Sequence, residues 1–351
     1  MTTVNIAPVY FKRALVVFLI VLSFMKGSAG QDKTADMSSA TFPDQLFVVS
    51  NRVVDSLPDG SVIFTNKVDT SGNLKYLIAD GDHKSYFTRG FPDLDSLLNN
   101  PAPYKDWAVW VHGDGQTFEI SLKRAREIQA IHKVNLIVFA WPTSEPGKGP
   151  IGNFRNSSNN ALLTAPGLHK FVHELSEYNN SEFNRIGSGN LSIFFHSLGC
   201  YLLREALNMG YLQDIPGDLF DNMVLNAAAT PSEGHAGWIE QLHIQARLYI
   251  VFNDEDFNLE GLRVLSGEGY QLGERPFPPL ASNAIYLDFT ESVGSRFPTG
   301  ATHSYYFDLM TEISNNIRET YTILFGGFPL RFADTNRFKP TQDSRVYQVL
   351  F

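Results

Sequence analysis

The sequence is poor in cysteine, in basic runs and in metal-ligand spacings. Its 351 residues include one cysteine, Cys200, so no intrachain disulfide can form and the fold must depend on its core. The formal net charge is −9 and no basic tract stands out, so nucleic acid is not an expected partner. Only His169 and His173 lie four apart on an expected helix, without a third ligand. No metal and no cofactor are therefore predicted.

An apolar run near the N-terminus has the features of an export signal. Lys12 and Arg13 precede apolar residues 14–25, and small residues follow at 27–30. This pattern predicts a signal peptide over 1–30 and a periplasmic or secreted protein. An uncleaved membrane anchor is the alternative, although the run is shorter than the roughly 20 residues of a membrane span. The polar segment 31–45 is expected to be flexible.

The remaining chain predicts an α/β fold. Its first part, 46–100, is expected to form antiparallel strands and loops, and from Trp107 apolar strands alternate with helices. This alternation predicts a mostly parallel central sheet with helices on both faces, in one domain over 46–325. The strands are expected at 46–50, 61–65, 74–79, 107–111, 134–140, 191–195, 222–226, 246–252 and 284–288. The helices are expected at 117–131, 157–178 with an interruption at Pro166-Gly167, 199–209 and 304–325. The C-terminal extension 326–351 either packs over the sheet edge or forms a tail.

Residues 191–200 combine a buried strand, a sharp turn and the start of a helix. A serine at the tip of such a turn projects its hydroxyl clear of the backbone, as in the nucleophile elbow of alpha/beta hydrolases, so Ser197 is the predicted nucleophile. The turn favours small residues two before and two after the serine. Gly199 meets this requirement and Phe195 does not. A serine that merely caps the helix is the alternative, and His196 is expected to point away from it.

A histidine and a group of acids complete the chemistry. His303 lies on a loop after the last apolar strand, where imidazole could take the serine proton and return it to a leaving group. An earlier strand ends in Asp254, Glu255 and Asp256, and a carboxylate is needed to orient the histidine. Asp254 and Asp256 are both candidates. The order of serine, acid and histidine is that of alpha/beta hydrolases.

The strand at 107–111 leads into a glycine-rich loop. Glycine lets a backbone approach a substrate, and its free N–H groups can face a developing negative charge. The amides of Asp114 and Leu198 are the expected oxyanion donors. The residues expected to support the site are His112, Gly113, Gly115, His196 and Gly199. A plain glycine-rich turn is the alternative; a phosphate-binding loop is disfavoured because no Gly-Lys-Ser/Thr follows.

These pieces form an ordered set of motifs. The set resembles a family of poorly characterised bacterial alpha/beta hydrolases, with Val-His-Gly, Trp-Pro-Ser, His-Ser-Met-Gly and His-Ser-Tyr-Phe motifs, over roughly 46–325. The matching segments here are Ser50-Asn-Arg, Val111-His-Gly, Phe139-Ala-Trp-Pro-Thr, His196-Ser-Leu-Gly, Asp256-Phe-Asn-Leu and Thr302-His-Ser-Tyr-Tyr. The resemblance favours Asp256 over Asp254, because the family has Asp-x-x-Leu after this strand.

The chain departs from the family at three places. Phe195 replaces a small residue, Thr143 replaces a serine, and Asn153 and Asn156 stand where the family has Tyr-x-x-Asp. None of these removes a catalytic candidate. The resemblance implies a serine hydrolase but no particular substrate. Together with the export signal, the sequence predicts an exported serine hydrolase that acts on a small-molecule or lipid ester. Three alternatives stay open: a non-catalytic binding protein on this scaffold, a lipase in transient contact with a membrane, and a peptidase. Oligomeric state and natural substrate stay open as well.

Overall fold

The computed structural model describes residues 45–56, 62–81, 86–145, 147–267, 269–298 and 300–351. The predicted signal peptide and nearly all of the polar segment after it lie outside these residues. Within them, no helix combines the length and the apolar character that crossing a membrane requires.

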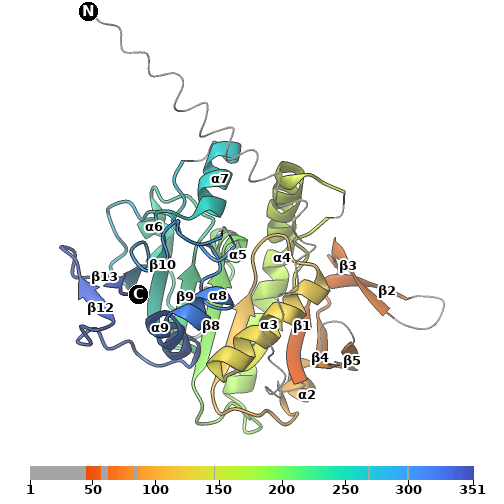
Figure 1. Ribbon diagram of the computed structural model, residues 1–351. Coiled ribbons are helices and arrows are strands. Elements are labelled where there is room, and N and C mark those ends of the chain that lie inside the picture. Colours follow the sequence, from red (N-terminus) through yellow and green to blue (C-terminus); the bar gives the residue numbers. More distant parts are fainter. Residues whose placement is uncertain (1–44, 57–61, 82–85, 146, 268, 299) are drawn as a thin grey trace, which may run out of the picture. The chain divides into compact units, whose positions relative to one another are not determined.

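Within the described residues, eleven strands form one mixed sheet in the order β12-β13-β11-β10-β9-β8-β6-β7-β1-β4-β5 (Figure 1). The neighbours from β1 through β7, β6, β8, β9, β10 and β11 to β13 are parallel, and β4, β5 and β12 are antiparallel to their neighbours. The bounds are β1 Gln45–Ser50, β4 Lys75–Gly81, β5 Tyr86–Phe91, β6 Trp107–Val111, β7 Asn135–Phe139, β8 Leu191–His196, β9 Phe220–Asn226, β10 Gln245–Phe252, β11 Ala284–Asp288, β12 Phe338–Pro340 and β13 Val346–Val349. A separate hairpin pairs β2 (Arg52–Ser56) with β3 (Val62–Val68).

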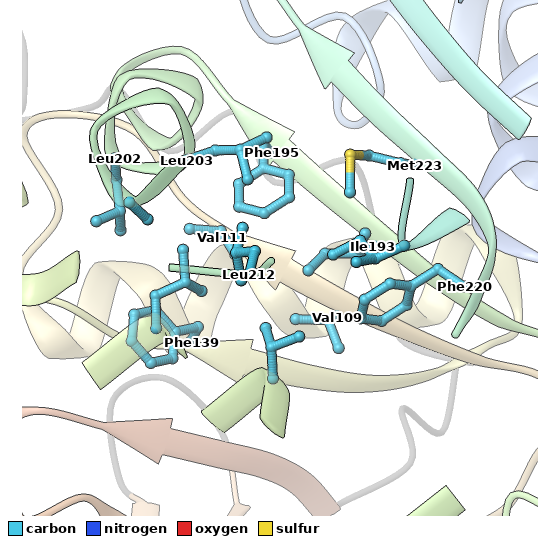
Figure 2. Close-up of a cluster of buried hydrophobic side chains, with 14 of the residues drawn as sticks. Val109, Val111, Phe139, Ile193, Phe195, Leu202, Leu203, Leu212, Phe220 and Met223 are labelled. Atoms are coloured by element: carbon cyan, nitrogen blue, oxygen red, sulfur yellow. The ribbon is translucent and has the colours of Figure 1, made fainter. Parts of the chain in front are cut away.

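Helices cover both faces of this sheet, which confirms the predicted α/β class. Every residue of β6, β7 and β8 is buried, as expected for strands packed on two sides. One core joins the sheet to α2, α4, α5 and α6, and part of it is drawn in Figure 2. The other core joins it to α3, α8 and α9. The helices are α2 Leu94–Leu98, α3 Phe118–His132, α4 Pro150–Asn179, α5 Leu198–Asn208, α6 His235–Ile239, α7 Phe257–Ser266, α8 Leu309–Ile313 and α9 Asn315–Phe325.

The strand order changes direction between β6 and β8. From β6 the chain moves outward to β7, whereas from β8 it moves the opposite way through β9 and β10 to β11. In open α/β sheets, ligands bind in the crevice outside the carboxyl ends of the strands at such a switch point. The loop after β6 and the turn after β8 are therefore the segments where a site is expected.

Two helix predictions were wrong. The helix α4 runs without interruption through Pro166, because Pro166 is exposed while Ala165, Gly167 and Leu168 are buried against the sheet on both sides of it. The single helix predicted over 304–325 is instead turn followed by α8 and α9. They divide at Ser314, whose backbone is extended. Its side-chain oxygen caps α9 by accepting from the Ile317 amide.

The C-terminal extension 326–351 belongs to the sheet. Strand β13 pairs in parallel with β11, for example Tyr286 with Val346, and β12 pairs with β13. The sheet thus continues past residue 325, and the extension forms strands at the sheet edge instead of a tail.

Candidate active site

Ser197 occupies a strained turn between β8 and α5. Its backbone has φ 53° and ψ −117°, a region that a residue with a Cβ adopts only at an energetic cost of order 1–3 kcal/mol. The turn is held because the Ser197 amide donates to the Asn226 carbonyl at 3.0 Å. The side chain makes no capping hydrogen bond to α5. The alternative of an ordinary N-cap serine is therefore not what this turn contains.

The residues around the turn explain its tolerance of Phe195. A Cβ on Gly199 would lie 2.6 Å from the Val111 carbonyl oxygen, so this position requires glycine. Phe195 does not face that contact, because its ring is buried in the same core as Leu203 and Met223 (Figure 2). Bulk at this position is directed into the core, away from the turn.

Asp256 and His303 are in direct contact. His303 Nδ1 lies 2.7 Å from Asp256 Oδ2, and both side chains are almost fully buried. The other carboxylate oxygen, Oδ1, accepts from the amides of Asn258 and Leu259 and caps α7. Because an ionised carboxylate only accepts, this contact places a proton on Nδ1 and leaves Nε2 free to accept one.

Asp254, the other acid considered from the sequence, is engaged elsewhere. It forms a two-point ion pair with Arg275, in which Arg275 Nε lies 2.8 Å from Oδ1. The side chain of Asp254 is 29% exposed. Asp254 therefore faces a surface arginine, whereas Asp256 faces the histidine.

The peptide after Gly113 is oriented by His112. His112 Nδ1 lies 2.9 Å from the Gly113 carbonyl oxygen. In a trans peptide the carbonyl and the following N–H point in opposite directions, so the Asp114 N–H is turned away from His112. A Cβ on Gly113 would lie 2.8 Å from Ser197 Cβ, which shows how closely this loop lies against the serine. Burial lowers the pKa of His112 to about 3, and the imidazole is neutral.

The peptide after Ser197 is oriented in the same manner. The Ser197 carbonyl accepts from the amides of Cys200, at 3.0 Å, and Ala229, at 3.2 Å. The Leu198 N–H therefore points to the other side, and as the first amide of α5 it has no carbonyl within its own helix to bind. Of the two amides predicted as oxyanion donors, one thus begins α5 directly after Ser197 and the other follows Gly113, which lies against Ser197.

The sequence did not identify the side chains that hold the loop after β6. Asp114 Oδ1 accepts from Asn153 Nδ2 at 2.9 Å and from Ser157 Oγ at 2.6 Å, both on α4. Burial raises the pKa of Asp114. Thr143 accepts from the amides of Gly115, through its carbonyl, and of Gln116, through its hydroxyl. Thr143, Asn153 and Ser157 thus hold this loop by hydrogen bonds.

His196 and Asn253 place the loop that carries His303. The rings of His196 and His303 lie 4.7 Å apart, and His196 Nε2 lies 3.2 Å from Ser304 Oγ. Burial lowers the pKa of His196 well below its ordinary value. At the end of β10, Asn253 Nδ2 donates to the Thr302 carbonyl at 3.1 Å. His196 is part of a sequence motif, whereas no sequence signal points to Asn253.

Ser197 and His303 are not hydrogen-bonded in this structure. Neither Ser197 Oγ nor His303 Nε2 has a hydrogen-bond partner among the described residues. Neither atom is one of the fully buried polar atoms that lack a partner in the described part of the chain. Catalytic hydrogen bonds of this kind are often long in the absence of substrate. In the described part of the chain no three His, Cys, Asp or Glu side chains come together to hold a metal, and His169 instead contacts Asp214.

The strand order, the strained serine turn and the acid–histidine contact at the carboxyl ends of the strands define an alpha/beta hydrolase fold. Neither a protein-family model nor a curated protein sequence matches the chain. Among solved structures it is similar to an esterase of Pyrobaculum calidifontis in two crystal structures and to a bacterial heroin esterase. The Pyrobaculum enzyme is 10% identical with a TM-score of 0.38, over 88% of this chain and 92% of that chain, in a monoclinic form. In the other structure it is 11% identical with a TM-score of 0.37, over 91% and 96%. The heroin esterase is 12% identical with a TM-score of 0.32, over 94% and 95%.

Proposed function

We propose that the protein is a serine hydrolase that cleaves carboxylic esters through an acyl-enzyme on Ser197. The observation that carries the proposal is the strained turn, which costs free energy and holds a serine whose hydroxyl is not used for capping. The second support is the Asp256–His303 contact at 2.7 Å, which fixes the histidine tautomer that a general base requires.

In the proposed reaction, Ser197 Oγ attacks the ester carbonyl carbon and its proton passes to His303 Nε2. The carbonyl oxygen becomes an oxyanion that accepts from the Asp114 and Leu198 amides. The carbon–oxygen bond to the alcohol then breaks, and the alcohol leaves with the proton from His303. Water attacks the acyl-enzyme with His303 again as base, which releases the carboxylic acid and restores Ser197.

The test is labelling with a fluorophosphonate probe together with turnover of p-nitrophenyl acetate. Wild type should be labelled and Ser197→Ala should not, with kcat lower by at least about 10⁴-fold. Ser158→Ala, on α4, is the control and should behave as wild type. Unchanged labelling or turnover in folded Ser197→Ala would exclude Ser197 as nucleophile. No labelling and no turnover in folded wild type would favour the binding-protein alternative.

Export is a separate part of the proposal and rests on the sequence of residues 1–30. Expression in a Gram-negative host should give a periplasmic or secreted protein whose mass lacks this segment. A full-length protein in the membrane fraction would instead support the uncleaved anchor.

A further inference from the structure

Arg52 is a buried arginine behind the loop after β6. The residue has no exposed surface. Its Nη2 donates to the carbonyl oxygens of Gln116, at 3.0 Å, and Trp141, at 2.7 Å. Its Nη1 donates to the Thr65 carbonyl and to Asn66 Oδ1, at 3.1 and 2.7 Å. One guanidinium therefore joins the β2–β3 hairpin to the ends of the loops that follow β6 and β7.

The two carbonyl groups belong to segments that hold the proposed oxyanion hole. Gln116 ends the glycine-rich loop, and its amide donates to Thr143 Oγ1 at 3.0 Å. Trp141 Nε1 donates to the His112 carbonyl at 2.9 Å. A shift of the Gln116 or the Trp141 carbonyl would thus displace the backbone before Gly113, at His112, or after Asp114, at Gln116. A planar guanidinium can hold two acceptors in fixed directions, which a lysine ammonium cannot.

The hydrogen bonds of the Arg52 guanidinium go to neutral oxygen atoms, and the carboxylate of Glu119 acts on its charge by raising the pKa of Arg52. A buried charge held by neutral acceptors is costly. Burial lowers the pKa of Arg52 to about 10, so the guanidinium is charged at neutral pH. Its field reaches the loop, because after burial it is the next largest cause that lowers the pKa of His112.

We propose that Arg52 is a positioning residue of the oxyanion hole, which fixes the loop from behind and presents a positive charge toward the negative charge that develops on the substrate oxygen. This inference rests on the proposed function. It assigns to Arg52 a contribution that grows as the oxyanion forms, since a fixed charge in a low-dielectric site favours the charged transition state over the neutral ester.

The experiment compares Arg52→Met, which removes both the planar guanidinium donors and the positive charge, with Arg52→Lys, which keeps only the charge. The control is Arg126→Met, because Arg126 is also buried and donates to a backbone carbonyl, that of Ala79. For each variant, kcat and KM for p-nitrophenyl acetate, the inhibition constant of a boronic acid and the Tm are measured. The boronic acid forms a tetrahedral adduct with the serine and mimics the oxyanion.

We expect kcat to fall about 100-fold in Arg52→Met and about 10-fold in Arg52→Lys. Neither loss should exceed the loss caused by removing a direct oxyanion donor. The boronic acid should bind more weakly by similar factors, with KM within about twofold, because the interaction is made in the transition state. A merely structural role would lower Tm without this matched loss. If Arg52→Met does not fold, Arg52→Lys decides.

The inference is overturned if the Arg52 variants lose no more kcat than Arg126→Met, or if kcat falls while boronic acid affinity stays at the wild-type value. Active wild type with unaffected Arg52 variants would reject this inference and leave the proposed function standing. Wild type without turnover or probe labelling would reject both.

Discussion

Replacement of Asp256 by asparagine should remove activity with almost no change of shape. The two carboxylate oxygens differ in their contacts: Oδ1 accepts from the Asn258 and Leu259 amides, and Oδ2 accepts from His303 Nδ1. In the variant the amide oxygen must stay at the helix cap, where two N–H groups face it, so the NH₂ group faces His303. An NH₂ group can only donate, and His303 must then carry its proton on Nε2. In that tautomer it cannot accept the Ser197 proton.

The expected loss in kcat is about 10⁴-fold, as for the same exchange in a serine protease triad. Stability should change by less than the roughly 1 kcal/mol of a lost N-cap, because the cap is retained. The matched control is Asp254→Asn, which breaks only a partly exposed ion pair with Arg275 and should change kcat by no more than about threefold. Hydrolysis of p-nitrophenyl acetate and urea unfolding provide the two readouts. If Asp256→Asn kept activity within tenfold of wild type, or Asp254→Asn lost as much as Asp256→Asn, this assignment of the acid would fail.

Three further predictions follow from burial and close contacts. Gly113→Ala should slow probe labelling at least about tenfold and lower the free energy of unfolding in urea by about 1–3 kcal/mol. The reason is that its Cβ would lie 2.8 Å from Ser197 Cβ and 3.1 Å from the His196 carbonyl oxygen. Labelling at the wild-type rate would refute this. Burial raises the pKa of Glu274 from 4.5 to about 7, so the folded state binds more protons than the unfolded state between these values and stability should fall as pH rises through them. Glu274→Gln should flatten that fall when unfolding is measured at pH 5 and pH 8, and an unchanged slope would contradict the assignment. Burial raises the pKa of the Cys200 thiol well above its ordinary value, so iodoacetamide at pH 8 should modify the unfolded but not the native protein, as mass spectrometry would reveal; rapid native alkylation would speak against it.

Local patterns were sufficient to predict most of the elements. The strand 107–111 is confirmed with the predicted bounds, and the predicted helix start at Thr117 is the N-cap of α3. The errors arise where distant contacts outweigh local preference. Packing on both sides keeps α4 helical through Pro166, and the extension 326–351 forms strands because β13 pairs with the distant β11 and β12 pairs with β13.

The residues of the candidate site likewise fall into those that the sequence could predict and those that it could not. Residues that a strand end or a sharp turn places, such as Ser197, have local signals in the sequence. Supports that reach across the chain have no such signal. Arg52 contacts Gln116 and Trp141 from a distant strand, and Asn253 contacts Thr302 across a loop. Hydrogen bonds between segments so far apart leave no periodicity that a single sequence could reveal.

The C-terminal strands also bear on how the protein behaves when it is cut or tagged. Strand β13 covers the backbone polar groups of β11, which is mostly apolar and leads toward the His303 loop. A chain shortened before Val346 would leave that edge open as a template for another chain, and edges of this kind promote aggregation. Clipping of the last few residues during purification would therefore be expected to appear first as lost solubility, before any loss of the proposed activity.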